Sequence, residues 1–213
     1  MSLPEQLWLT HLPLTGHKRI LGDPSAQHKF VMGLFPDGLG ESPRQRAGAL
    51  YRIEQNRDAA PSMLVQSLIA PNTAHHHGAR VRSMLLVLDQ MIEGNPVRYR
   101  LAVNPVRTVL PEGAEPKSGV RGRRKDLRGA EADQWWESRA KDAGLRLESL
   151  RSREHHFSRA RKRTEKPVSY HGVCFDGVAE VVDRAALVRA VVEGIGRGRP
   201  YGLGLLSVVP IGG

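Results

Sequence analysis

The most regular feature of the chain is a set of short segments in which apolar and polar positions alternate. Residues 7–14 read LWLTHLPL, with the period of two that is typical of a half-buried strand. The segments 49–56 and 62–71 also have the character of strands and are joined by the turn-like RDAAP. A longer alternating segment, 97–110, predicts a further strand, and the apolar run after residue 204 predicts the last one.

Capping residues predict where the helices begin and end. Asp23, followed by a proline, predicts a short helix beginning near residue 24. Asp183 likewise opens a predicted helix over 183–196. A third helix is predicted over 131–145, with Gly144 as its stop. The apolar face of this helix consists of Trp135, Trp136, Ala140 and Ala143.

Three other segments do not show a clear pattern of a single strand or helix. Residues 75–95 are compatible with helix, strand or both. Residues 111–131 contain two prolines, four glycines and a basic run, which predicts an exposed loop or linker. The pair Asp176-Gly177, with alternating apolar residues on both sides, predicts the turn of a β-hairpin.

The order of these elements predicts an α+β fold built from two similar halves. Each half offers strand, helix, two strands, a less certain helix and a strand, which is the βαββαβ order of a ferredoxin-like domain. We therefore expect two tandem ferredoxin-like domains, at 1–110 and 131–213, joined by a linker at 111–130. This is also the frame of the RRM, but aromatic residues make up only 5% and no strand carries paired aromatics for base stacking.

The charge is unevenly distributed along the chain. Lys and Arg number 32 against 22 Asp and Glu, giving a net charge of +10 and an isoelectric point near 10.3. Residues 117–166 contain 16 basic and 8 acidic residues, so this stretch alone carries +8. Such clustering favours a surface that binds a polyanion, nucleic acid above all, over an ordinary charged surface.

Other features narrow the class of protein. No run approaches the roughly 20 apolar residues of a membrane helix, and residues 1–14 lack the pattern of a secretory signal. The single cysteine, Cys174, forms no internal disulfide and alone makes no metal site. We therefore expect an intracellular, cytoplasmic protein with no membrane partner.

A glycine-rich loop precedes the last strand. Residues 194–204, GIGRGRPYGLG, contain five glycines and two arginines. The loop follows a helix and precedes a strand, so it is not a dinucleotide fingerprint, and it lacks the Gly-Lys-Ser/Thr of a P-loop. Two interpretations remain: a loop that lies close to a phosphate backbone with Arg197 and Arg199 as charge partners, or a tight connection, for which one or two glycines would suffice.

At this loop the sequence resembles a known family. GIGRGRPYGLGLLSVVP is similar to the C-terminal loop and strand of CRISPR-associated repeat-processing endoribonucleases, in particular the CasE family of the type I-E surveillance complex. Further similar segments occur in the same order along nearly the whole chain: WLTHLPL, DPSAQHKF, LVQSL, RLAVNPVR and VCFDGVAEVVD.

The resemblance implies a fold, a reaction and partners. Members of this family look like two tandem ferredoxin-like domains that bind the stem-loop of CRISPR repeat RNA and cut once at the base of the stem. The implied reaction uses no metal and no cofactor. The 2′-hydroxyl attacks the adjacent phosphate and leaves a 2′,3′-cyclic phosphate and a 5′-hydroxyl. The enzyme then stays on its product and joins the other subunits of the surveillance complex.

The resemblance also points to a catalytic residue. The family's histidine lies in the first helix, which corresponds to His28 in DPSAQHKF, and an imidazole suits either proton transfer because its ordinary pKa is near 6.5. In similar sequences a tyrosine stands three residues earlier, where this chain has Ser25. The Ser25 hydroxyl either hydrogen-bonds the phosphate or helps to cap the helix, which leaves the second catalytic group open. Lys29 is a candidate phosphate contact.

RNA-binding residues are expected in two places. Family members carry a basic hairpin at the position of residues 151–166, which hold seven basic and two acidic residues. The hairpin residues expected to contact the RNA stem are Arg159, Arg161, Lys162 and Arg163. The expected contacts of the glycine-rich loop are Gly196, Arg197, Gly198, Arg199, Gly202 and Gly204.

Two other functions remain open alongside cleavage. The replacement at Ser25 leaves room for a non-catalytic RNA-binding subunit with the same fold. A metal-dependent nuclease would need convergent ligands, and three adjacent histidines at 75–77 point in different directions, so an exposed loop is favoured there. Trp135 and Trp136 favour core packing or a protein interface over base stacking.

Overall fold

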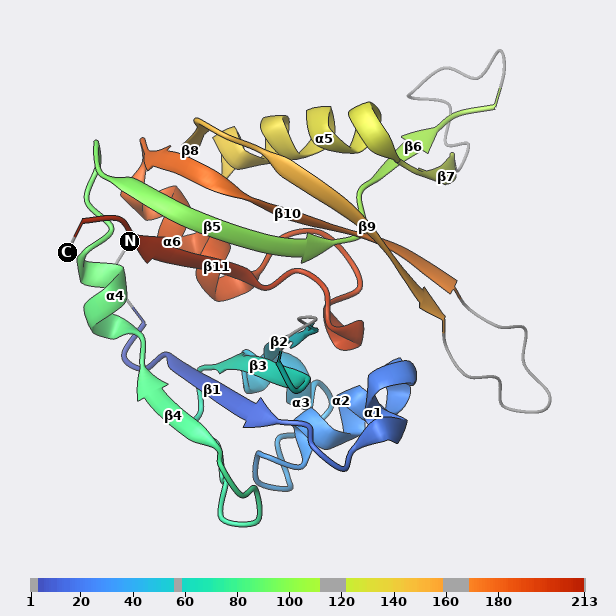
Figure 1. Ribbon diagram of the computed structural model, residues 1–213, viewed down its shortest axis with the longest axis vertical. Coiled ribbons are helices and arrows are strands. Elements are labelled where there is room, and N and C mark those ends of the chain that lie inside the picture. Colours follow the sequence, from blue (N-terminus) through green and yellow to red (C-terminus); the bar gives the residue numbers. More distant parts are fainter. Residues whose placement is uncertain (1–3, 56–58, 112–121, 159–168, 213) are drawn as a thin grey trace.

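The first of two antiparallel sheets is built from the N-terminal part of the chain. The computed structural model describes residues 4–55, 59–111, 122–158 and 169–212 (Figure 1). The strands of the first sheet lie in the spatial order β2, β3, β1, β4. They are β1 (Trp8–Pro13), β2 (Leu50–Glu54), β3 (Ser62–Ser67) and β4 (Arg80–Ser83). All three neighbouring pairs are antiparallel, which is the arrangement of a ferredoxin-like unit.

Three helices occupy the first crossover of this unit, between β1 and β2. They are α1 (Lys18–Gly22), α2 (Pro24–Met32) and α3 (Pro43–Arg46). The second crossover, residues 68–79, has turns but no helix. The segment 75–95, which the sequence left open, contains both β4 and the short helix α4 (Leu85–Asp89).

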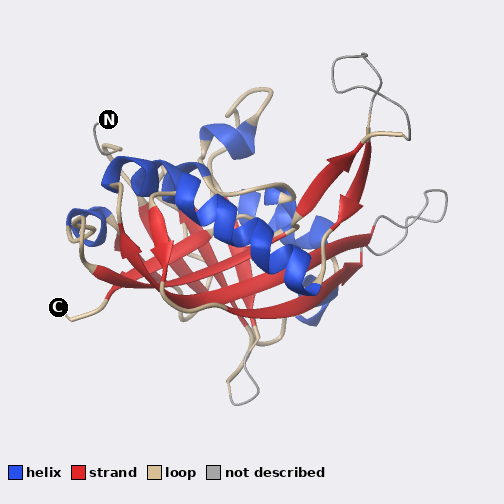
Figure 2. Cartoon of the chain, turned by 90° about the horizontal axis from the view of Figure 1, so that it is seen from above, coloured by secondary structure: helices blue, strands red, loops and turns tan. Residues whose placement is uncertain are grey.

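The second sheet repeats the same topology with both helices present. Its strands follow the order β11, β5, β10, β8, and β9 also pairs with β10. They are β5 (Pro96–Val103), β8 (Leu145–Leu147), β9 (Arg151–Ser158), β10 (Ser169–Val181) and β11 (Leu206–Pro210). Helices α5 (Gly129–Asp142) and α6 (Arg184–Glu193) complete the βαββαβ order, and Figure 2 shows helices lying across the strands. The predicted tandem ferredoxin-like fold is confirmed.

The strand predicted over 97–110 differs from the structure. It was expected to close the first unit, but β5 pairs with β10 and β11 of the second sheet. Buried Leu101 and Val103 belong to the core of that sheet, and β4 takes the fourth place in the first. The strand breaks at Asn104, and β6 (Val106–Val109) then pairs with β7 (Arg123–Asp126), so part of the expected linker 111–130 is a strand. The chain passes from one sheet to the other between β4 and β5.

The predicted hairpin turn at Asp176-Gly177 is wrong. Strand β10 runs through both residues without a break and pairs with β5 on one side and β9 on the other. A Cβ at Gly177 would lie 2.0 Å from the Ser149 carbonyl oxygen and 2.7 Å from the Tyr99 hydroxyl. The glycine therefore permits another segment of the backbone to approach the strand closely, which is a common reason for a glycine within a strand.

The helix signals agree with the structure. Asp23 caps α2 by accepting a hydrogen bond from the Ser25 amide at 2.8 Å, and Asp183 caps α6 by accepting one from the Ala186 amide at 2.9 Å. Gly144 follows α5 with a φ of +71°. No described helix is long and apolar enough to cross a membrane.

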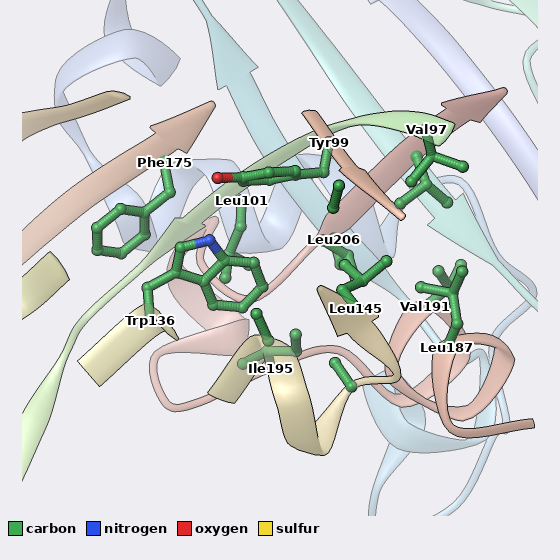
Figure 3. Close-up of a cluster of buried hydrophobic side chains, with 14 of the residues drawn as sticks. Val97, Tyr99, Leu101, Trp136, Leu145, Phe175, Leu187, Val191, Ile195 and Leu206 are labelled. Carbon is green, nitrogen blue, oxygen red and sulfur yellow. The ribbon is translucent and has the colours of Figure 1, made fainter. Parts of the chain in front are cut away.

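Apolar side chains from α5, α6 and the second sheet form the larger core (Figure 3). Trp136 is fully buried and stacks on Phe175 with ring centroids 5.9 Å apart. Tyr99 packs against the same indole at 5.6 Å. The expectation that Trp136 packs in the core is confirmed. Trp135, half-buried, packs at the edge of this cluster, beside the glycine-rich loop.

A buried arginine ties the first sheet to the second. Arg52 on β2 is only 5% exposed and donates to the Leu205 carbonyl at 3.1 Å and to Glu54 at 2.6 Å. Glu54 also pairs with Arg100 on β5 at 2.9 Å, and Arg100 pairs with Asp176. Because these contacts join β2 to the centre of the second sheet, they fix the first unit beside the segment that leads into β11.

Candidate active site

His28 is positioned by the capped helix α2. Asp23 closes the first turn, so the residues that follow are held in helical register. Ser25 and His28 are one turn apart on the same face, both half-buried. The Nδ1 atom of His28 is buried without a hydrogen-bond partner. Lys29, the next residue, is exposed.

The electrostatic surroundings favour the neutral form of His28. Burial lowers the pKa of His28 below its ordinary 6.5, and the charge of Arg44 lowers it further. A histidine in this state is largely unprotonated at neutral pH and can accept a proton. The arrangement therefore suits a general base.

The glycine-rich loop lies against α2. The loop connects α6 to β11 and contains the short 3-10 helix η1 (Arg199–Tyr201), which contacts α2 and β2; Figure 1 shows it between the second sheet and α2. The Tyr51 hydroxyl donates to the Pro200 carbonyl at 2.8 Å. These contacts bring residues from the two ends of the chain to one place.

All five loop glycines have a positive φ and little room for a Cβ. At Gly202, with φ of +79°, a Cβ would lie 3.0 Å from the Tyr51 ring. At Gly204, with φ of +92°, a Cβ would lie 2.8 Å from the Ile195 carbonyl oxygen. Gly202 and Gly204, which were expected to contact RNA, are buried, and side chains there would press on the Tyr51 ring of β2 and on the loop itself. The exposed loop backbone lies at Gly196 and Arg197, with Gly198 half-buried.

The loop arginines have different positions. Arg197 is exposed, and its backbone forms a bridge to Asn104 at the end of β5. Arg199 is half-buried, donates from Nη2 to the Gly194 carbonyl at 3.0 Å, and has a buried Nε without a partner. Arg199 lies on η1, which packs against the helix that carries His28, whereas Arg197 lines a depression on the outer side of the loop.

Arg44, on α3, interacts electrostatically with both His28 and Arg199, although no pattern in the sequence pointed to it. It is half-buried and donates to the Ala49 carbonyl at 3.1 Å. Burial lowers its pKa, and the nearby charge of Arg199 lowers it further. The only signal in the sequence is a pair of arginines after Ser42-Pro43, and nothing local indicates that one of them faces a histidine 16 positions earlier.

A depression of about 580 Å³ lies on the outer side of the loop, bordered by α5, α6 and the β6–β7 ribbon. Its basic lining residues are Arg124, Arg139, Arg189 and Arg197. Asp142 and Glu193 are the acidic ones, and Arg139 is paired with Asp142. The surface there carries an excess of positive charge.

The other predicted RNA contacts lie outside the described residues. Arg159, Arg161, Lys162 and Arg163 are in the segment between β9 and β10. These two strands pair antiparallel from Arg151↔Asp176 to Ser158↔Ser169. His76, from the histidine run, packs edge-on against Phe30 of α2 at 5.0 Å, and no described group of three or more His, Cys, Asp or Glu residues is arranged to hold a metal.

The structure combines two tandem ferredoxin-like units with a basic glycine-rich loop that packs against the helix carrying His28. The chain belongs to the family described as CRISPR associated protein, whose sequence model matches residues 7–210.

Individual relatives extend over nearly the whole chain. It is 28% identical to the CRISPR-associated endoribonuclease Cse3 of Thermus thermophilus, covering 96% of this chain and 100% of the relative. It is 30% identical to the CRISPR system Cascade subunit CasE of Escherichia coli, covering 86% and 90%. The structure of Thermus thermophilus Cse3 bound to an RNA representing a pre-cleavage complex superposes with a TM-score of 0.76 at 26% identity, covering 96% of this chain and all of that one.

Proposed function

We propose that this chain is an endoribonuclease that cuts CRISPR precursor RNA at the base of the repeat stem-loop. It acts without a metal ion and stays bound to the mature guide RNA as a subunit of a type I-E surveillance complex. The observation that carries the proposal is a half-buried histidine with a lowered pKa on α2, the helix against which the cationic glycine-rich loop packs. Relatives named as an endoribonuclease and as a Cascade subunit support it.

The proposed reaction forms one bond to phosphorus and breaks another. His28 takes the proton of the 2′-hydroxyl, the 2′ oxygen bonds to the adjacent phosphorus, and the bond from phosphorus to the 5′ oxygen breaks. The departing 5′ oxygen takes up a proton, so the products are a 2′,3′-cyclic phosphate and a 5′-hydroxyl. General base catalysis of this kind contributes about 10²–10⁴ in rate. We assign Ser25, one turn earlier on α2, a hydrogen bond to the phosphate.

RNA binding is assigned to basic residues on both sides of the loop. Lys29, Arg199 and the exposed backbone near Gly196 and Gly198 would contact phosphates near the cut, and Arg197 would do so along the outer depression. The hairpin residues Arg159, Arg161, Lys162 and Arg163 would contact the stem. Contacts of this kind are largely to phosphates, so binding would weaken steeply with salt.

The test is cleavage of a palindromic repeat RNA in EDTA, followed on a denaturing gel. Wild type is expected to make a single cut at the stem base. His28→Ala is expected to cut at least about 100-fold more slowly and to shift the RNA on a native gel within about threefold of wild type. His77→Ala removes an exposed histidine and serves as the matched control, with wild-type cleavage.

Other outcomes would assign other functions. RNA that stays intact yet shifts with both proteins would make the chain a non-catalytic stem-loop-binding subunit. Cleavage that stops in EDTA and returns with a divalent metal would refute the metal-independent reaction. Product ends that lack a cyclic phosphate would refute attack by the 2′-hydroxyl.

A further inference from the structure

Two arginines from distant parts of the chain, Arg44 and Arg199, lie close enough to interact electrostatically, and Arg44 also interacts with His28. Arg44 donates to the carbonyl of Ala49, immediately before β2, at 3.1 Å. Arg199 donates to the Gly194 carbonyl at 3.0 Å. The two anchoring segments touch, because a Cβ at Gly194 would lie 2.9 Å from Cδ1 of Leu50, the neighbour of Ala49. Each of these hydrogen bonds uses one of the five N–H donors of its guanidinium group.

No carboxylate balances this pair in the part of the chain that the structure describes. Other partly buried arginines, such as Arg52 and Arg100, are paired with Glu54 or Asp176. Arg44 and Arg199 have no such ion pair, and the Nε of Arg199 is buried without an acceptor. Two half-buried like charges without a counter-ion are unfavourable in the free protein, and an anion with several acceptor oxygens would relieve this.

We propose that Arg44 is a catalytic residue, which together with Arg199 forms an anion site that holds the phosphate at the point of cleavage. The proposal rests on the proposed function and names a residue for it. Guanidinium groups match phosphate oxygens in geometry and stay charged at any working pH. Fixed cations at the phosphate stabilise the charge that accumulates as the 2′ oxygen attacks.

Arg44 also affects the pKa of His28, the proposed general base. Burial is the first cause of the lowered pKa of His28 and the charge of Arg44 is the second. Other titratable or charged groups lie on α2, at its cap or on segments packed against it. Those with described side chains include His17, Arg19, Asp23, Lys29, Tyr51, His76, Arg199 and Tyr201. Removing the Arg44 charge is therefore expected to raise the pKa of His28, which is a readout that needs neither RNA nor cleavage.

The experiment compares Arg44→Gln with Arg46→Gln. Arg46 lies on the same short helix and is exposed, so its substitution makes the same change of charge without facing His28. Single-turnover cleavage is expected to fall about 100-fold in Arg44→Gln, and to stay within about twofold of wild type in Arg46→Gln. Arg44→Lys keeps the charge and is expected to recover part of the rate. Thermal unfolding checks that each variant is folded.

Two measurements on RNA-free protein separate this inference from the proposed function. In wild type and Arg46→Gln, inorganic phosphate is expected to shift the NMR signals of His28, and in Arg44→Gln the shift is expected to be lost and the His28 pKa raised. If wild type does not cut RNA but phosphate binding depends on Arg44, the proposed function falls and the anion site stands. If Arg44→Gln titrates and binds phosphate as wild type does, or if wild type cuts RNA and Arg44→Gln cuts at the rate of Arg46→Gln, the anion site is refuted.

Discussion

The hydrogen bond from Tyr51 to the glycine-rich loop gives a measurable link between loop position and cleavage. The Tyr51 hydroxyl donates to the Pro200 carbonyl at 2.8 Å, next to Arg199. Burial, above all, raises the pKa of Tyr51, so the phenol keeps its proton, and the bond persists, through any ordinary assay pH. Tyr51→Phe removes this bond and retains the ring that packs beneath Gly202.

The size of the effect follows from the bond that is lost. A hydrogen bond of this type contributes a net stability of about 1 kcal/mol. In a chain of this length, that loss lowers the melting temperature by about 2–4 °C. If the bond holds the loop in its active position, the same free energy corresponds to cleavage about fivefold slower.

The matched control is Tyr99→Phe. Tyr99 donates its hydroxyl to the Ser149 carbonyl at 3.0 Å, within the second sheet and away from the loop. Both variants are expected to melt at similarly lower temperatures, whereas single-turnover cleavage is expected to slow in Tyr51→Phe alone. Equal cleavage by the two variants would refute the argument that this bond positions the loop.

Two further predictions concern the pH dependence set by His28 and the close packing at Gly177 in the second sheet. The rate of single-turnover cleavage should rise with pH below 6.5 and level off above it, because His28 must be unprotonated to act as a base and its pKa is lowered; a rate that falls as pH rises through this range would make His28 the acid. Gly177→Ala should destabilise the protein by about 1–3 kcal/mol in thermal or denaturant unfolding, because its Cβ meets the Ser149 carbonyl oxygen at 2.0 Å. Gly22→Ala, with open space around the Cβ, is the control, and equal stabilities would contradict the close approach.

Local signals in the sequence predicted the elements that local physics controls. Asp23 and Asp183 each cap the helix that they were expected to cap, because the hydrogen bond is made to an amide two or three residues away. The alternating segment 7–14 forms β1 for a similar reason, since a period of two suffices to place one face toward a core.

Signals that depend on distant contacts were misread or missed. Gly177 has the local pattern of a turn residue, but its role is set by Ser149, 28 positions earlier. Strand β5 was placed in the wrong unit because alternation predicts a strand and not its partner. Arg44 was missed because only the folded chain brings α3 to the glycine-rich loop and α2. The proposal that His28 is catalytic came from family resemblance, since one histidine on a helix has no distinctive local pattern.

The placement of η1 against α2 affects the order in which the protein becomes functional during its synthesis. His28 and Arg44 leave the ribosome early, but Arg199 and the loop that carries it arrive only after both sheets have most of their strands. Contacts between residues so far apart form late and slowly in folding. A nascent or shortened chain therefore has His28 and Arg44 without Arg199, and the proposed anion site is completed only when the segment leading into β11, at the edge of the second sheet, has been made.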